Sequence, residues 1–282
     1  EQQVVPQARP VVLRGLVASW PLVQQARQSP EALCQALLAL DSGVPVDAVM
    51  VPPGCAGRLF YSDDHQGFNF LRRPLTLTQT IEHLVRYSHF AQPPSVAVQS
   101  APLSTCAPGF AGAHAQPLLP TTVAPRLWLG NAITTPAHFD ESHNIACVVA
   151  GQRRFTLWPP EQIGNLYPGP PLHAPTGTPL SLADLQAPDF QRFPRLRQAF
   201  AAAQSTVLAP GDALYIPPLW WHHVVSMSAL NALVNYWWRA PDDGPAMDLL
   251  LTAMRTLGRQ SAAQRRAWAA VLGHFVLDAA AD

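Results

Sequence analysis

The sequence has 282 residues, a length that suits one large domain or a domain with an appendage. Hydrophobic residues make up 48% of it and charged residues only 13%, which indicates a globular chain with a well-filled core. The formal net charge is zero and no basic run is present, which argues against binding to nucleic acid or to an anionic membrane surface. Every basic side chain is arginine and alanine is abundant, which we interpret as the bias of a GC-rich bacterial genome.

No apolar run approaches the ~20 residues of a membrane-spanning helix. The first residues, Glu1-Gln2-Gln3, lack the basic and apolar regions of a signal peptide, although the missing initiator Met leaves the true start of the chain open. We therefore expect a cytoplasmic protein. Its cysteines show no C-x-x-C pairing, so reduced thiols are expected rather than disulfides: Cys34, Cys55, Cys106 and Cys147.

The first half of the chain alternates short strands with two helices. Its expected elements are an edge strand at 10–14, a helix at 30–40, strands at 46–51 and 58–61, a helix at 77–90 and a strand at 96–99. Residues 101–125 are rich in Pro, Ala and Gly, which predicts a long surface loop.

The second half reads as a series of strands punctuated by turns, a pattern typical of a sandwich or barrel. Beyond the strand that carries His138 and Asp140, the expected strands are 126–130, 145–150, 153–158, 206–208, 213–216, 224–227 and 232–238. Residues 161–205 form a Pro-rich excursion without strand alternation, which predicts a functional or covering loop.

The tail changes character and predicts a domain boundary, with residues 1–243 before it and 244–282 after it. Pro245 starts a helix that Gly258 ends, and Ser261 with Gln264 forms a capping box for a second helix. Both helices carry an apolar stripe, which serves either to pack on the sheet or to pair with a second copy of the chain. We favour the second reading, a homodimer, because both stripes are broad and long.

One short stretch carries the chemistry. His138 and Asp140 are two residues apart, so on a strand both side chains leave the same face and can bind one ion. A third ligand can come from the distant His222-His223 pair, of which only one can face the ion. Two imidazoles and one carboxylate leave three positions of an octahedron open, which suits Fe(II) that also takes up a cosubstrate and dioxygen. The plainer alternative is a hydrogen-bonded His–Asp pair inside a sandwich.

The string His138-x-Asp140-x3-Asn144-x6-Gly151 has the spacing of the first cupin motif, and residues 211–222 resemble the second. Here the chain resembles the JmjC/cupin-like (Cupin_8) Fe(II)/2-oxoglutarate-dependent oxygenases, and most of all the asparaginyl hydroxylase that inhibits hypoxia-inducible factor. The shared segments lie between residues 126 and 238. The resemblance implies a mainly β fold, with a double-stranded β-helix (jelly-roll) core, flanking N-terminal helices and a C-terminal helical pair. It also implies that His138, Asp140 and His222 hold the iron.

The same resemblance assigns the binding site of the cosubstrate, 2-oxoglutarate. Arg153 stands where the family has a lysine that binds the distal carboxylate, and its planar fork can grip that group bidentately. The other implied residues are Thr135 at the same carboxylate, Asn144 and Asn235 near the metal-bound end, and Trp237 as a pocket wall. The alternative for Arg153 is a solvated strand end, and a tyrosine that the family places near Gln99 is absent.

The function we expect is an Fe(II)- and 2-oxoglutarate-dependent dioxygenase that hydroxylates a C–H bond, with no catalytic residue beyond the metal ligands. The expected substrate is a protein or peptide side chain or a small molecule, walled by the 101–125 and 161–205 segments. Two alternatives stay open: a non-catalytic or differently metallated cupin that only binds, and an N-methyl demethylase. The remaining histidines are read as surface or hydrogen-bonded residues; His143, for example, has the opposite strand parity to His138.

Overall fold

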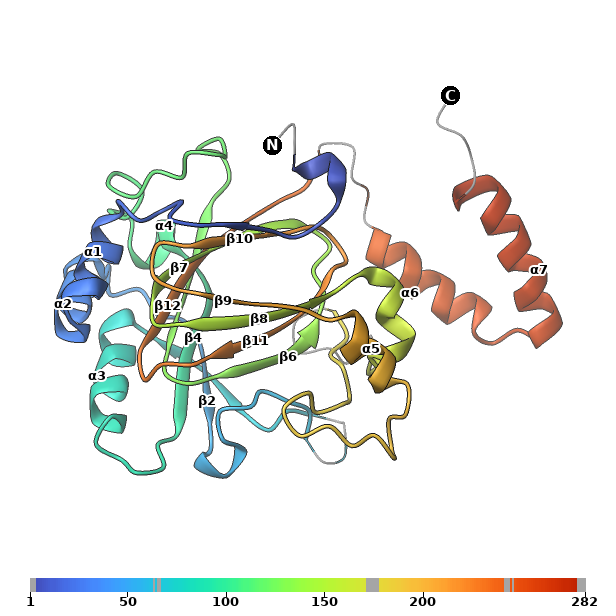
Figure 1. The fold of residues 1–282 in the computed structure, drawn as a ribbon, viewed down its shortest axis with the longest axis horizontal. Helices are drawn as coiled ribbons and strands as arrows, with labels where there is room; N and C mark the ends of the chain where they lie inside the picture. Colours follow the sequence, from blue (N-terminus) through green and yellow to red (C-terminus); the bar gives the residue numbers. More distant parts are fainter. Residues whose placement is uncertain are drawn as a thin grey trace. The chain divides into compact units, whose positions relative to one another are not determined.

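Figure 1 shows the fold in a computed structural model, which describes residues 4–62, 64, 67–170, 178–240, 244 and 246–277. The chain forms two compact units, residues 1–239 and residues 240–282. The first unit is built on two antiparallel sheets, and the second consists of helices.

The larger sheet of the first unit has eight strands and the smaller has four. In spatial order the larger sheet contains β1 (Val11–Leu13), β10 (Ala213–Ile216), β7 (His143–Ala150), β12 (Asn231–Trp238), β5 (Pro125–Gly130), β4 (Ser95–Pro102), β2 (Val46–Val51) and β3 (Leu71–Leu75). The smaller contains β6 (Thr134–His138), β11 (Trp221–Ser226), β8 (Arg153–Trp158) and β9 (Gln204–Leu208). This mainly β arrangement confirms the predicted jelly-roll class.

Two apolar layers hold the larger sheet in place. On one face, Ala146 and Val148 of β7 pack with Phe155 and Leu157 of β8, so this layer lies between the two sheets. On the other face, side chains from the helices bury the alternate strand residues, Ile145 among them. Because β7 is covered on both faces, residues 145–150 of this strand form a continuous apolar run rather than an alternating one.

The covering helices gather on one side of the β-domain, at the left of Figure 1. They are α1 (Pro21–Gln28), α2 (Pro30–Leu40) and α3 (Leu77–Tyr87), with the short α4 (Leu103–Cys106) nearby. The Ser29 side chain accepts a hydrogen bond from the Ala32 N–H at the start of α2, and Thr76 with Gln79 forms a capping box for α3. Both predicted helices are therefore present, although α3 ends three residues before its predicted end.

Two sequence expectations in this unit are wrong. Residues 58–61 form no strand; Arg58 and Tyr61 make only isolated bridges, because the Asn69 side chain takes up the Phe60 N–H. Residues 101–125 are not merely a surface loop, since they begin in β4 and α4 and bury Phe110 and His114 against the helices. The apolar side chains among the prolines and alanines explain this burial.

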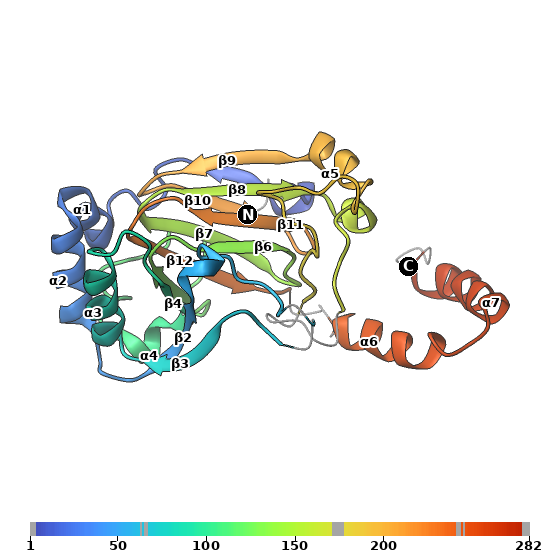
Figure 2. The same ribbon diagram turned by 90° about the horizontal axis from the view of Figure 1, so that it is seen from below.

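The 161–205 excursion folds onto the smaller sheet rather than forming an open loop. It contains a 3-10 helix (Pro160–Asn165), α5 (Leu196–Ala202) and the start of β9. The Ser181 N–H donates to the Ala137 carbonyl at 2.7 Å, and the Trp158 indole donates to the Ala199 carbonyl at 2.8 Å. Figure 2 shows α5 at the end of β8 and β9. Residues 171–177 of the excursion lie outside the described residues.

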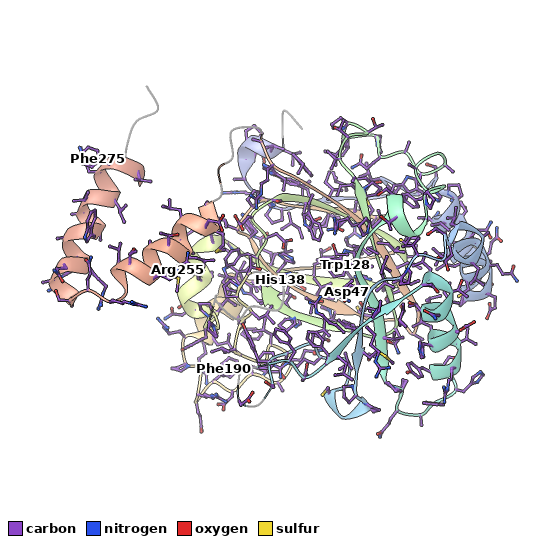
Figure 3. The ribbon with its side chains drawn as sticks, turned by 180° about the vertical axis from the view of Figure 1, so that it is seen from behind. Asp47, Trp128, His138, Phe190, Arg255 and Phe275 are labelled. Carbon is purple, nitrogen blue, oxygen red and sulfur yellow. The ribbon has the colours of Figure 1, made fainter. Side chains whose placement is uncertain are left out.

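The second unit contains α6 (Ala246–Leu257) and α7 (Ala262–Leu272), which runs into a π-helical turn (Gly273–Leu277). The predicted capping box of Ser261 and Gln264 is present; Pro245 lies outside the described residues. No described residue of these helices is buried, and the exposed apolar side chains include Leu250, Trp268 and Phe275, the last labelled in Figure 3.

Within the described part of the chain, no helix is both long and apolar enough to cross a bilayer. All four cysteines are free, as their spacing predicted.

Candidate metal centre

Three side chains from the two predicted motifs converge at one end of the smaller sheet. His138 ends β6 and lies directly opposite His222 of β11. The candidate ligand atoms of His138, Asp140 and His222 all lie within 4.8 Å of one another, and the two imidazole centroids are 4.2 Å apart. His222 Nε2 is 3.7 Å from Asp140 Oδ2. The arrangement can hold one ion with open coordination positions.

The strand carrying this motif is shorter than predicted. β6 ends at His138, so Asp140 lies just beyond it, where the Asp140 carbonyl accepts a hydrogen bond from the Leu219 N–H at 2.8 Å. A register shift between His222 and Val224 places two residues of β6 opposite one residue of β11. This bulge falls at Pro136-Ala137, where proline cannot donate to the ladder.

Both imidazoles are held in the tautomer that a metal needs. His138 Nδ1 is 2.9 Å from the Pro136 carbonyl, and His222 Nδ1 is 3.0 Å from the Trp220 carbonyl. A carbonyl only accepts, so each Nδ1–H donates and each Nε2 keeps its lone pair for an ion. Burial, reinforced by the neighbouring His138, lowers the pKa of His222 to about 4, so this imidazole is neutral at neutral pH.

The structure also separates the two adjacent histidines. His222 faces the cavity, whereas His223 leaves the other face of β11, where it is buried. Burial lowers the pKa of His223 to about 4. His143, as its parity predicted, faces away from the metal centre and stacks on Trp238 with ring centroids 5.1 Å apart.

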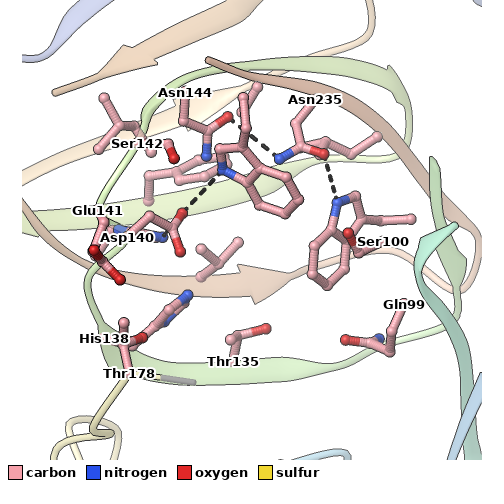
Figure 4. A pocket seen from close by; sticks show the side chains of 18 of the residues that line it. Gln99, Ser100, Thr135, His138, Asp140, Glu141, Ser142, Asn144, Thr178 and Asn235 are labelled. Carbon is pink, nitrogen blue, oxygen red and sulfur yellow. Dashed lines mark hydrogen bonds and ion pairs between the residues drawn. The ribbon is translucent and has the colours of Figure 1, made fainter. Parts of the chain in front are cut away.

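The Asp140 carboxylate is fixed from the larger sheet. The Trp237 indole N–H donates to Asp140 Oδ2 at 3.1 Å (Figure 4). Beside it, the Trp128 indole donates to Asn235 Oδ1 at 2.9 Å, and Asn235 Nδ2 donates to Asn144 Oδ1 at 3.4 Å. These three hydrogen bonds give the wall above the metal centre a defined shape.

A cavity of about 550 Å³ contains the metal centre, which is large enough for a small cosubstrate and part of a substrate. All five residues assigned to cosubstrate binding line it together with the three candidate ligands: Thr135, Asn144, Arg153, Asn235 and Trp237. The structure therefore gathers every candidate site residue in one cavity.

Arg153 is the least expected member of this cavity wall. It is only 9% exposed, so the interpretation as a solvated strand end is wrong; the neighbouring Arg154 is the exposed one. Its Nε is buried with no hydrogen-bond partner, and it forms no ion pair with a described residue. Burial lowers the pKa of Arg153 to about 10, so the guanidinium stays charged at neutral pH. A buried unpaired cation is costly, and an anionic ligand offsets that cost.

Sequence reasoning missed several residues of the wall. Gln99 and Ser100 face the cavity because β4 has a register shift between Val98 and Ala101, and Ser100 has a φ of 51°. Trp128 also lines the cavity, although its β5 strand was predicted. The outer rim carries two ion pairs, Asp47 with Arg72 and Glu141 with Arg239. None of these positions has a local sequence signal, because distant strands bring them together.

Curated proteins similar to this chain include JmjC-type demethylases. The chain is 34% identical over 114 residues to lysine-specific demethylase JMJ31 of Arabidopsis thaliana, covering 40% of this chain and 20% of the relative. It is 32% identical over 170 residues to Jumonji C domain-containing protein 5 of Drosophila melanogaster, covering 60% and 39%. Lysine-specific demethylase 8 of Xenopus tropicalis is 26% identical over 242 residues, covering 84% and 49%. The chain thus spans between a fifth and a half of the length of these relatives.

Among solved structures, ycfD from E. coli aligns with a TM-score of 0.48 and 18% identity, covering 90% of this chain and 56% of that one. The predicted closer likeness to the asparaginyl hydroxylase that inhibits hypoxia-inducible factor stays a prediction. The family model described as a cupin-like domain matches residues 1–244. This match confirms the predicted family, and the chain belongs to the cupin-like domain proteins.

Proposed function

We propose that this chain is an Fe(II)- and 2-oxoglutarate-dependent dioxygenase that hydroxylates a C–H bond of a protein or peptide side chain. One observation carries the proposal: a three-residue ligand set and a buried, unpaired arginine face the same cavity. The ligand set alone fits a binding module equally well. A buried cation in the same cavity calls for an anionic second ligand, which the oxygenase reaction uses and a simple metal site does not.

The residues present fit the iron. His138 and His222 each offer a neutral Nε2, and Asp140 offers a carboxylate oxygen whose orientation the Trp237 indole fixes. Two nitrogens and one oxygen form the set that non-haem Fe(II) oxygenases use with open positions. Iron bound there, with 2-oxoglutarate and dioxygen, supplies the oxidation, in which one oxygen atom enters succinate and the other enters the substrate C–H bond, with loss of CO2.

The protein side of this reaction is binding, orientation and exclusion of water. Arg153 would pair with the distal carboxylate of 2-oxoglutarate, with Thr135 as a hydroxyl donor beside it. Arg153 lies opposite Ser226, which is four residues along β11 from His222. At about 3.3 Å per residue, this separates Arg153 from the level of His222 by about 13 Å along the strand. Asn144 and Asn235 would lie beside the end of the cosubstrate that faces the metal.

Two further features of the predicted function remain proposals. Removal of an N-methyl group begins with the same C–H oxidation, and two relatives are named lysine-specific demethylases, so demethylation is the second candidate.

We also propose that the exposed apolar side chains of α6 and α7 pair two copies of the chain. Burying such side chains is favourable by about 1.5–3 kcal/mol each.

The test measures succinate produced from 2-oxoglutarate with Fe(II) and ascorbate, with and without peptide substrates, together with Mn(II) binding by titration. His138→Ala and Asp140→Ala should lose both metal binding and succinate formation. His89→Ala, which removes an exposed histidine just beyond the end of α3, should leave both unchanged. Wild-type protein that binds no metal, or a His138→Ala variant that still produces succinate, would refute the proposal.

The role of Arg153 has a separate test. Arg153→Gln should weaken 2-oxoglutarate binding by about 10- to 100-fold, because a charge-assisted hydrogen bond is lost. Mn(II) binding should stay the same, since Arg153 is remote from the ligands. An unchanged affinity for 2-oxoglutarate would remove Arg153 as its anchor.

A further inference from the structure

A second arginine lies on the larger sheet beside residues of the cavity wall, although it does not itself line the cavity. Arg126 lies two residues before Trp128 on β5 and directly opposite Asn235 of β12. Residues two apart on a strand leave the same face, and both Trp128 and Asn235 line the cavity. The Arg126 side chain therefore leaves β5 on the cavity side.

The β4 bulge holds this arginine in place. Arg126 Nε donates to the Ser100 carbonyl at 3.0 Å and lies 2.7 Å from the Ser100 hydroxyl. Ser100 adopts a left-handed backbone, which is unfavourable for a serine. Such bulges often re-aim side chains beside active sites. Here the bulge brings Ser100 to the cavity wall and ties it to Arg126.

The terminal part of the Arg126 guanidinium has no hydrogen-bond partner among the described residues. Its Cζ lies 6.0 Å from the Trp237 ring centroid, and the indole N–H of that ring bonds Asp140. The two terminal nitrogens of Arg126 make no hydrogen bond or ion pair with any described residue. The half-buried guanidinium of Arg126 thus has two terminal nitrogens available for a ligand. The Trp237 ring lies between it and Asp140, a candidate metal ligand.

The other charges of the cavity wall are matched. Of the carboxylates that line the cavity, Asp47 pairs with Arg72, Glu141 pairs with Arg239, and Asp140 belongs to the metal centre. No carboxylate of the described wall is left over for a cationic substrate. Among the described residues, two guanidinium groups here have no ion-pair partner: Arg153 in the wall, on the smaller sheet, and Arg126 beside the wall, on the larger sheet.

We propose that Arg126 binds a carboxylate of the substrate, so that the reaction acts on an acidic side chain or beside one. This assignment rests on the proposed oxygenase function and narrows its substrate class. Arg153, on the smaller sheet, takes the distal carboxylate of the cosubstrate, and Arg126 takes the anionic group that enters past Ser100. A methylated lysine is disfavoured, because its cation would face Arg126 without a free carboxylate nearby.

The experiment compares blocked peptides, acetyl-Gly-Xaa-Gly-amide with glutamate, glutamine or lysine at Xaa, by titration calorimetry. The protein is saturated with Mn(II) and 2-oxoglutarate, so that Arg153 is occupied. The glutamate peptide should bind at least about tenfold more tightly than the glutamine peptide, and the lysine peptide most weakly. Arg126→Gln should remove this preference, and Arg126→Lys should keep part of it. Arg73→Gln, an exposed arginine on β3, is the control and should keep all of it.

A repeat with metal-free Arg153→Gln protein separates the two proposals. There the glutamate preference should persist, whether or not iron and 2-oxoglutarate support turnover. Equal binding of the glutamate and glutamine peptides by the wild type, no binding of any peptide, or an unchanged preference in Arg126→Gln would overturn the assignment. Absence of succinate formation with an intact glutamate preference would instead refute the oxygenase function alone.

Discussion

Thr135 and His138 are three residues apart on β6, and both side chains line the same cavity. On a regular strand, an odd separation would place them on opposite faces. The bulge at Pro136-Ala137 inserts one residue and restores a common face. A residue assigned to the cosubstrate and a metal ligand can therefore work from one short strand.

The indole of Trp237 should control metal affinity through Asp140. Trp237→Phe keeps the ring but removes the N–H that bonds Asp140 Oδ2. We expect Mn(II) affinity to fall by about 10- to 100-fold, as is typical when a partner of a metal ligand is lost. Calorimetric titration of the metal-free protein measures this. The matched control is Trp238→Phe, whose ring stacks on His143; equal effects of the two variants would contradict the assignment.

Arg153 should reduce the stability of the protein when no anion is bound. Replacing the buried, unpaired guanidinium in Arg153→Gln should raise the free energy of unfolding by about 1–3 kcal/mol, because a desolvated charge is removed. Urea unfolding without metal or 2-oxoglutarate measures this. Arg154→Gln, at the exposed neighbouring position, should change stability by less than about 0.5 kcal/mol. A destabilised Arg153→Gln protein would contradict this prediction.

Alkaline pH should destabilise the fold through buried acids. Burial raises the pKa of Cys106 from 9.0 to about 11 and that of Tyr215 from 10.0 to about 12. The folded protein therefore holds protons that the unfolded chain releases. The contribution of these two groups to the free energy of unfolding is fully present below pH 9. It is lost as the pH rises from 9 towards 12, by up to about 3 kcal/mol for each group.

Urea unfolding between pH 8 and pH 11 measures this slope. Cys106→Ala should flatten the part that starts near pH 9, and Tyr215→Phe the part that starts near pH 10. The neutral-pH stability of each variant provides its own reference. A slope that neither substitution changes would assign the alkaline transition to other groups.

The C-terminal unit should determine the oligomeric state. The 282-residue chain should elute as a dimer in size-exclusion chromatography with light scattering, because α6 and α7 expose apolar side chains. Trp268→Glu should give a monomer, whereas Arg266→Glu, a charge change on the same helix, should stay dimeric. Mn(II) binding should be equal in both. A monomeric wild type would contradict the prediction.

Local signals account for the parts of the fold that sequence reasoning predicted. The bounds of β8 are as expected because Gly151 turns the chain before it and Pro159 ends it. The cap at Ser29 placed α2. The spacing and the family resemblance pointed to the three residues that the structure brings together, His138, Asp140 and His222, whose role as ligands stays a prediction; the bulge at Pro136-Ala137 has no signal in the sequence.

Features that depend on distant pairing escaped prediction. The wall residues Gln99 and Ser100 face the cavity because of a register shift against β5, which leaves no trace in the local sequence. The helix α5 was hidden in a Pro-rich stretch, since its stability comes from packing, as the Trp158 contact to Ala199 illustrates. Arg126 has the sequence context of an ordinary strand start, and only its contact with Ser100 distinguishes it.

Each ring that would hold the ion is oriented by the carbonyl two residues before it on the chain: Pro136 for His138 and Trp220 for His222. The orientation of the two imidazoles is thus set within two tripeptides of the smaller sheet, whereas Asp140 alone depends on the opposite sheet, through Trp237. Substitutions at positions such as Arg126 and Gln99, during evolution or redesign, would therefore change which substrate the cavity accepts without changing how the two imidazoles are oriented toward the ion.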